Sequence, residues 1–172
     1  CFPKDVKGLI QIAQESGIRF GILEEVEATN QAQKQSLLGK IQRLLGEDLH
    51  GKNITLWGLA FKPHTDDVRE APALVIIKQL LDRGAKVKVF DPIAKESAKR
   101  ILGNSVVYED NLEDSLKNAD ALVIVTEWPE FKEVDLKMIK AKMKTAYVVD
   151  GRNAFSPKEM RKQEIKYISV GR

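Results

Sequence analysis

The sequence has little cysteine and histidine, with one Cys and two His among 172 residues. A single cysteine cannot form a disulfide within the chain, and such usage is typical of the reducing cytoplasm, where we expect the protein. Cys1, His50 and His64 are far apart in the sequence, so they indicate no metal site. No apolar run approaches the roughly 20 residues of a membrane helix, so we expect neither a membrane span nor a signal peptide.

A strong excess of one charge is also lacking. The chain has 28 Lys and Arg against 25 Asp and Glu, which leaves a net charge of only +3. No basic stripe stands out along the sequence, so we do not expect a nucleic-acid partner. Hydrophobic residues make up 43% of the chain, enough for an ordinary core without disulfides or metals.

The most informative stretch is Gly58–Pro72, which reads Gly-Leu-Ala-Phe-Lys-Pro-His-Thr-Asp-Asp-Val-Arg-Glu-Ala-Pro. A short apolar run precedes it and an amphipathic pattern follows it, as in the first turn of a nucleotide-binding βαβ unit. Lys62 and Arg69 are cations that suit a diphosphate. The G-x-G-x-x-G fingerprint is absent, so the pattern alone leaves a solvated charged loop as an equal alternative.

From Gly51 onward, β-prone runs alternate with amphipathic segments, which predicts an α/β fold with a Rossmann-like doubly wound parallel sheet. The expected strands are 53–60, 86–90, 105–108, 121–126, 145–149 and 165–170. The expected helices are 72–83, 95–102, 111–117, 136–144 and a short one from Ser156-Pro157. Parallel strands end at one edge, so the loops at Phe61-Lys62, Thr126-Glu127 and 150–152 should meet there.

Two residues at this edge have more than one interpretation. Asp91 follows the second expected strand, where a Rossmann fold often binds ribose hydroxyls, but Asp91-Pro92 is also an ordinary turn opener. Trp128 follows the fourth strand, and an aromatic side chain there is more often a packing residue than a ligand contact.

Two helices are expected before the sheet. The spacing of apolar residues from Val6 predicts a helix that stops near Gly17, with Pro3 discouraging helix before it. A second helix should run from Ile22 to Leu45, about 36 Å at 1.5 Å per residue, with a polar centre at 29–36. It could pack on its own domain or connect two domains.

Three motifs together resemble the UDP-glucose 6-dehydrogenase family. Gly58–Pro72 is close to the family pattern G-L-A-F-K-x-x-T-D-D-x-R-E-x-P, Cys1-Phe-Pro-Lys-Asp5 resembles its nucleophile motif, and Asp150-Gly-Arg-Asn153 resembles a third block. The order is the same, and the resemblance covers essentially the whole chain. In the family an NAD-binding domain precedes the cysteine, so we interpret the chain as a C-terminal fragment.

The resemblance implies an enzyme that oxidises UDP-glucose to UDP-glucuronate with two NAD⁺. The family's cysteine, here Cys1, attacks the aldehyde formed by the first oxidation; the thiohemiacetal loses a second hydride, and the thioester is hydrolysed. Asp5 matches the carboxylate that transfers protons in that hydrolysis. The family's general-base lysine and its neighbouring asparagine lie upstream of Cys1, so we expect the chain alone to be inactive.

The resemblance also implies how ligands are bound. Phe61 and Lys62 would contact the UDP-sugar, and Arg152 would help to bind it. Arg69 would reach across the domain interface to the NAD cofactor. The residues that would line this cofactor are Cys1, Phe2, Pro3 and Lys4.

The implied domain division has three parts: 1–21 as a remnant of the preceding domain, 22–47 as a connecting and dimerisation helix, and 51–172 as the UDP-sugar-binding domain. The long helix would then lie at the core of a homodimer. Two alternatives remain open at this point. One is a sister dehydrogenase for UDP-N-acetylmannosamine or GDP-mannose, and the other is a non-catalytic module for nucleotide-sugar binding and dimerisation.

Overall fold

The computed structural model describes residues 2–171 and divides the chain into two compact units. The first ends at Ser36 and the second begins at Leu37, so the boundary falls inside a helix. Among residues 2–171, no helix is both long enough and apolar enough to cross a membrane.

The first unit consists of α1 (Phe2–Glu15) and most of α2 (Gly21–Leu45). α1 starts earlier than the predicted Val6, because Pro3 lies in the first turn, where its missing N–H removes no helical hydrogen bond. Gly17 ends α1 as predicted: its φ is +71°, and the N–H of Ile18 returns to the carbonyl of Ala13 at 2.8 Å. The predicted long helix is confirmed, one residue longer at its start.

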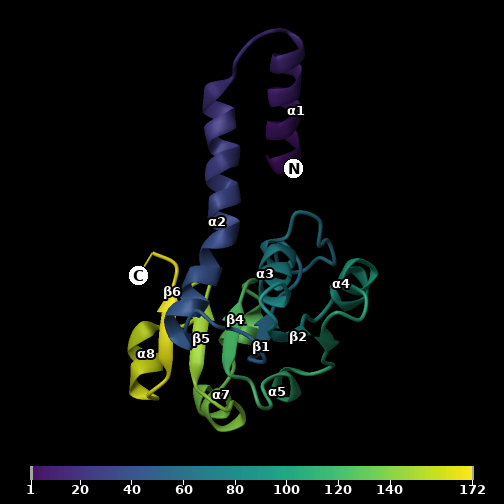
Figure 1. Cartoon of the computed structure of the whole chain (residues 1–172). Helices are drawn as coiled ribbons and strands as arrows, with labels where there is room; N and C mark the ends of the chain where they lie inside the picture. The colour runs from purple at the N-terminus through teal and green to yellow at the C-terminus, as the bar shows by residue number, and fades with distance from the viewer. Residues whose placement is uncertain (1, 172) are drawn as a thin grey trace. The chain divides into compact units, whose positions relative to one another are not determined.

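The second unit is built on six parallel strands in the order β3-β2-β1-β4-β5-β6 (Figure 1). This is the strand order of a Rossmann fold, so the predicted fold class is confirmed. The strands are β1 (Asn53–Trp57), β2 (Lys86–Phe90), β3 (Val107–Tyr108), β4 (Ala121–Ile124), β5 (Tyr147–Asp150) and β6 (Lys166–Ser169).

Helices cover both faces of this sheet. The last turns of α2 share one apolar cluster with α3 and α4, while α5, α6, α7 and α8 contribute to a second cluster. β1 shows the alternation that divides them, since Ile54 and Leu56 face the first cluster and Trp57 faces the second. The helices are α3 (Pro72–Leu81), α4 (Lys95–Leu102), α5 (Leu112–Ser115), α6 (Pro129–Lys132), α7 (Leu136–Lys142) and α8 (Pro157–Lys162).

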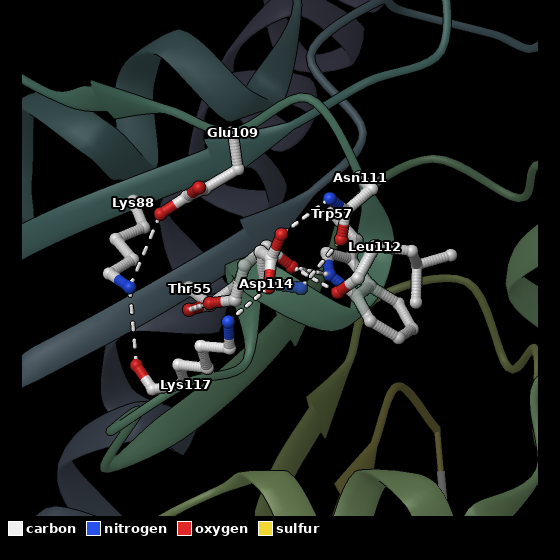
Figure 2. A network of polar contacts seen from close by, with 9 residues as sticks. Thr55, Trp57, Lys88, Glu109, Asn111, Leu112, Asp114 and Lys117 are labelled. Atoms are coloured by element: carbon white, nitrogen blue, oxygen red, sulfur yellow. Dashed lines mark hydrogen bonds and ion pairs between the residues drawn. The ribbon is translucent and has the colours of Figure 1, made fainter.

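A network of hydrogen bonds connects α5 to β1 (Figure 2). Trp57 donates its indole N–H to Ser115 Oγ at 2.8 Å, and Thr55 donates its hydroxyl to the Ser115 carbonyl at 2.6 Å. Ser115 Oγ in turn donates to the carbonyl of Leu112 at 2.7 Å. Asn111, the first residue of the predicted helix 111–117, caps α5 by accepting the N–H of Asp114 at 2.8 Å. These bonds satisfy polar groups that the strand buries between its apolar residues.

Several element ends differ from the prediction. β1 ends at Trp57 instead of residue 60, because Gly58 turns the chain with a φ of +92°. α6 is a further difference, since none of the predicted helices covers Pro129–Lys132. The short helix predicted from Ser156-Pro157 is present as α8, and Ser156 takes the N-cap position without a side-chain capping bond.

Candidate functional site

The carboxyl ends of the strands form one edge of the sheet, and three loops leave it side by side. They follow β1, β4 and β5, with the β4 loop in the middle because β4 lies between the other two strands. The chain leaves β1 towards β2 on one side and returns to β4 on the other. In open α/β sheets such a reversal opens a crevice where ligands bind.

Asp91 directly follows β2, and its side chain joins the segments that follow β1, β2 and β4. Its carboxylate is buried, and its acceptor sites are filled by five N–H groups. The ribose interpretation of Asp91 is therefore not supported, and the turn interpretation is. The donors are the backbone N–H groups of Leu59 (2.7 Å), Ala60 (3.2 Å), Ile93 (2.9 Å) and Ala94 (2.7 Å) and the indole N–H of Trp128 (3.2 Å).

The β1 and β4 loops are also joined to each other. Thr126 donates its hydroxyl to the Ala60 carbonyl at 2.6 Å. A Cβ on Gly58 would lie 2.5 Å from Thr126 Cβ, so only glycine permits this close approach. Trp128 is buried, which confirms the packing role expected for it. These contacts fix the backbone from which the next two side chains project.

Phe61 and Lys62 are exposed at the end of this braced loop. The Lys62 ammonium lies 5.3 Å from the centroid of the Phe61 ring, within the range of a cation–π contact. Within residues 2–171 the structure shows no hydrogen bond or ion pair that occupies this ammonium. An exposed aromatic ring beside an uncommitted cation can pack on a sugar or base and bind an anion at the same time.

The β5 loop begins with Asp150-Gly-Arg-Asn153, and Asp150 fixes its path. The buried Asp150 carboxylate accepts hydrogen bonds from the N–H of Arg152 (2.9 Å), the N–H of Phe155 (3.1 Å) and the hydroxyl of Tyr167 (2.8 Å). Gly151 passes so close to β4 that an added Cβ would lie 2.9 Å from the carbonyl oxygen of Ile124. The loop therefore carries Arg152 on a backbone that is fixed by its own first residue.

Arg152 makes a two-pronged ion pair with Glu127 of the β4 loop. Its Nη2 donates to Glu127 Oε1 at 2.6 Å, and its Nε donates to Oε2. Hydrogen bonding to the guanidinium lowers the pKa of Glu127, against the effect of its partial burial. Sequence reasoning placed Glu127 at this edge without a role. The sequence did contain a signal for this pair, because Glu127 and Arg152 follow strands that are neighbours in the sheet.

Arg69, on the long β1–α3 loop, is paired in the same way with Asp67. Arg69 Nε lies 2.9 Å from Asp67 Oδ1, and Nη2 lies 2.7 Å from Oδ2. This pairing lowers the pKa of Asp67 to about 2 and raises the pKa of Arg69. The two residues line an open depression of about 450 Å³ together with Thr65, Asp66, Val68 and Ser97.

The remaining predicted site residues belong to the first unit. Cys1 lies outside the described residues. Phe2, Pro3, Lys4 and Asp5 form the first turn of α1, and Lys4 and Asp5 are exposed. The roles assigned to these five residues stay predictions.

The edge of the sheet does not have the features of a dinucleotide site. The turn after β1 contains Gly58 but no G-x-G-x-x-G pattern, and Asp91, the acid after β2, has its acceptors filled by N–H donors. We therefore derive no step through NAD from this sheet.

Comparison with known sequences decides the family. The sequence profile of the UDP-glucose/GDP-mannose dehydrogenase family, UDP binding domain, matches residues 55–157, which is more than half of the chain. The chain belongs to this family. The match includes the Phe61-Lys62 loop, the Glu127 loop and Arg152, so all three loops of the edge lie in the domain that the family uses for UDP.

Individual members of the UDP-glucose/GDP-mannose dehydrogenase family are similar over the whole chain. UDP-glucose 6-dehydrogenase TuaD of Bacillus subtilis is 44% identical over 172 residues, and the UDP-glucose 6-dehydrogenase of Pseudomonas aeruginosa is 40% identical over 177 residues. Each match covers 100% of this chain but only 37% and 39% of the relative. The chain thus spans less than half the length of these two proteins.

Solved structures of the family agree with the fold. The UDP-glucose dehydrogenase of Pyrobaculum islandicum superposes with a TM-score of 0.83 at 33% identity, covering 99% of this chain and 36% of that one. The UDP-D-ManNAc dehydrogenase of Pyrococcus horikoshii gives 0.79 at 28% identity, covering 100% and 38%.

Proposed function

We propose that the chain is the UDP-sugar-binding part of an NAD-dependent UDP-glucose 6-dehydrogenase. Such an enzyme converts UDP-glucose, two NAD⁺ and water into UDP-glucuronate and two NADH. The observation that carries the proposal is the placement of Lys62 and Arg152 on loops at the switch point of a domain matched to the family's UDP-binding domain.

The two cations suit different parts of a diphosphate. Lys62 presents a mobile point charge from the β1 loop, whereas Arg152 presents a planar set of donors from the β5 loop. Phe61 adds an exposed ring next to Lys62, which can cover an apolar face of the ligand. Together they neutralise the two negative charges of the diphosphate and orient the sugar.

The catalytic and cofactor roles are proposed from the family motif alone. Cys1 would be the nucleophile, and Asp5 would handle the proton in thioester hydrolysis. Phe2, Pro3, Lys4 and Arg69 would help to hold NAD, which accepts the hydride when it is bound. Arg69 is held by Asp67 through Nε and Nη2, which is consistent with a guanidinium whose remaining donors bind the cofactor.

We further propose that the chain forms a homodimer through α2. The first unit of the chain exposes six large apolar side chains, of which two lie on α2, two on α1 and two between these helices, and exposed apolar surface of this kind marks interaction sites. Burying them against a second copy would contribute roughly 25 cal/mol per Å² before ordering costs. These side chains are Leu9, Ile12, Ile18, Phe20, Ile22 and Val26.

UDP-glucose is favoured over the alternative sugars. Several curated relatives at 40% identity or more, TuaD of Bacillus subtilis among them, are named UDP-glucose 6-dehydrogenases. The UDP-D-ManNAc dehydrogenase of Pyrococcus horikoshii is less similar, at 28% identity. We therefore do not favour a sister dehydrogenase.

Calorimetric titration of UDP tests the binding part of the proposal. A charge-assisted hydrogen bond is worth roughly 1.5–3 kcal/mol, so Lys62→Ala should weaken UDP about ten- to a hundredfold. Lys86→Ala is the matched control, because Lys86 is an exposed lysine at the opposite, amino end of β2. Absence of UDP binding to the unmodified chain would overturn the proposal, and equal affinities for wild type and Lys62→Ala would remove Lys62 from the site.

A further inference from the structure

We propose that Glu127 is a positioning residue for nucleotide-sugar binding, and that it acts by holding the Arg152 guanidinium with its outer edge open to the diphosphate. The inference rests on the proposed function and adds a residue to which the three sequence motifs assign no role.

The geometry of the pair shows which donors are used. A guanidinium has a side fork, formed by Nε and Nη2, and an end fork, formed by Nη1 and Nη2. Glu127 occupies the side fork, with one carboxylate oxygen on Nε and the other on Nη2. In the part of the chain that the structure describes, Nη1 has no hydrogen-bond partner. The end fork is thus left for a second bidentate anion.

The arrangement is fixed from both sides of the pair. Arg152 is anchored by its own backbone N–H, which donates to the buried Asp150. Glu127 follows Thr126, whose hydroxyl is bonded to the β1 loop at Ala60. A carboxylate on the β4 loop therefore sets the plane of a guanidinium on the neighbouring β5 loop. Without the Glu127 carboxylate, the long Arg152 side chain would be mobile in the free protein. It would then have to be ordered when the ligand binds, and this loss of rotamer freedom lowers the affinity.

A competing interpretation is that Glu127 occupies the place of the diphosphate and must be displaced. That would require the ligand to use the side fork. The open end fork makes displacement unnecessary, because a phosphate can approach Nη1 while Glu127 stays bound. The two interpretations predict opposite effects of neutralising Glu127, so they can be separated by experiment.

The test is a double-mutant cycle with UDP as the probe. We expect Glu127→Gln to weaken UDP about three- to thirtyfold, because the amide keeps only one acceptor for the side fork. In an Arg152→Ala background the same change should have less than a twofold effect. Glu164→Gln is the matched control, since Glu164 also pairs with a cation but lies just before the amino end of β6.

Each outcome decides the matter. Tighter UDP binding by Glu127→Gln would establish displacement and overturn the proposal, as would unchanged binding. An equal loss with and without Arg152 would show a structural role that does not act through the arginine, and would also overturn it. If wild type fails to bind UDP, the proposed function itself fails. If wild type binds UDP and Arg152→Ala weakens it, only the role of Glu127 is in question.

Discussion

In the second unit Trp57, Ile76 and Phe131 are completely buried, whereas in the first unit Ile12, Ile18 and Ile22 expose 60%, 63% and 76% of their surface. The sheet closes its own core with helices on both faces. The two helices of the first unit pack against each other, and several of their apolar side chains remain exposed. We therefore expect the second unit to be stable by itself and the exposed apolar residues of the first unit to be covered by another surface.

The largest effect expected is from Phe131→Ala in the second unit. Phe131 is fully buried and its ring lies 5.2 Å from that of Trp57, so truncation leaves a cavity between α6 and β1. We expect a loss of about 3–5 kcal/mol in the free energy of unfolding, measured by urea denaturation. Ile22→Ala in the first unit should change it by less than about 0.5 kcal/mol. Similar losses in both variants would contradict the contrast between the units.

A second comparison uses one glycine from each unit. Gly58→Ala should cost about 2–4 kcal/mol, because φ is +92° and the new Cβ would lie 2.5 Å from Thr126 Cβ. Gly8→Ala in α1 should instead gain about 0.5–1 kcal/mol of helix stability, because among residues 2–171 only its chain neighbours and the backbone of its own helix come within 4 Å of the added Cβ. Thermal unfolding of both variants checks the signs. A neutral Gly58→Ala would show that the loop can move away from β4.

A third variant addresses the apolar surface of the first unit. Ile22→Glu should leave the unfolding free energy nearly unchanged but weaken self-association, because a charge would enter the surface that a second copy buries in the proposed homodimer. Sedimentation at tens of micromolar, a concentration range suited to weak interfaces, measures the effect. Gln35→Glu, which adds one negative charge at an exposed position on the polar part of α2, is the control. A wild type that sediments as a monomer would count against the homodimer.

The smallest effect concerns the pH dependence of the Asp67–Arg69 pair. The pKa of Asp67 is lowered from 3.8 to about 2 by Arg69, so the stabilising contact is present above pH 4 and is lost as the pH falls through 2. A carboxyl titration by NMR should give a midpoint near 2 in wild type and a higher one in Arg69→Ala. The two midpoints should coincide if the pair does not exist in solution.

Much of the second unit could be predicted from local pattern. The run Ala121–Ile124 is continuously apolar because its strand is buried on both faces, and Pro72 marks the start of α3. Lys62 and Arg152 were predicted to share an edge because parallel strands end together. These features depend on residues that are neighbours in the sequence or on the topology itself.

The features that could not be predicted depend on contacts between distant residues. The pairing of Glu127 with Arg152 joins positions 25 residues apart, and no spacing rule connects them. The end of β1 depends on the approach of Gly58 to Thr126. The boundary between the units lies within α2, where the helical pattern runs on and only packing distinguishes Leu37 from Ser36.

The five hydrogen bonds of Asp91 have a consequence for the order of folding. Three of its donors are 31, 32 and 37 residues away, so these bonds cannot form until the ends of β1, β2 and β4 have come together. Closing such long loops costs entropy before any of the bonds is gained. We therefore expect the carboxyl edge of the sheet, where the ligand is proposed to bind, to be completed late, after the strands themselves have paired. Stopped-flow measurements should then show Asp91→Asn accelerating unfolding more than it slows folding.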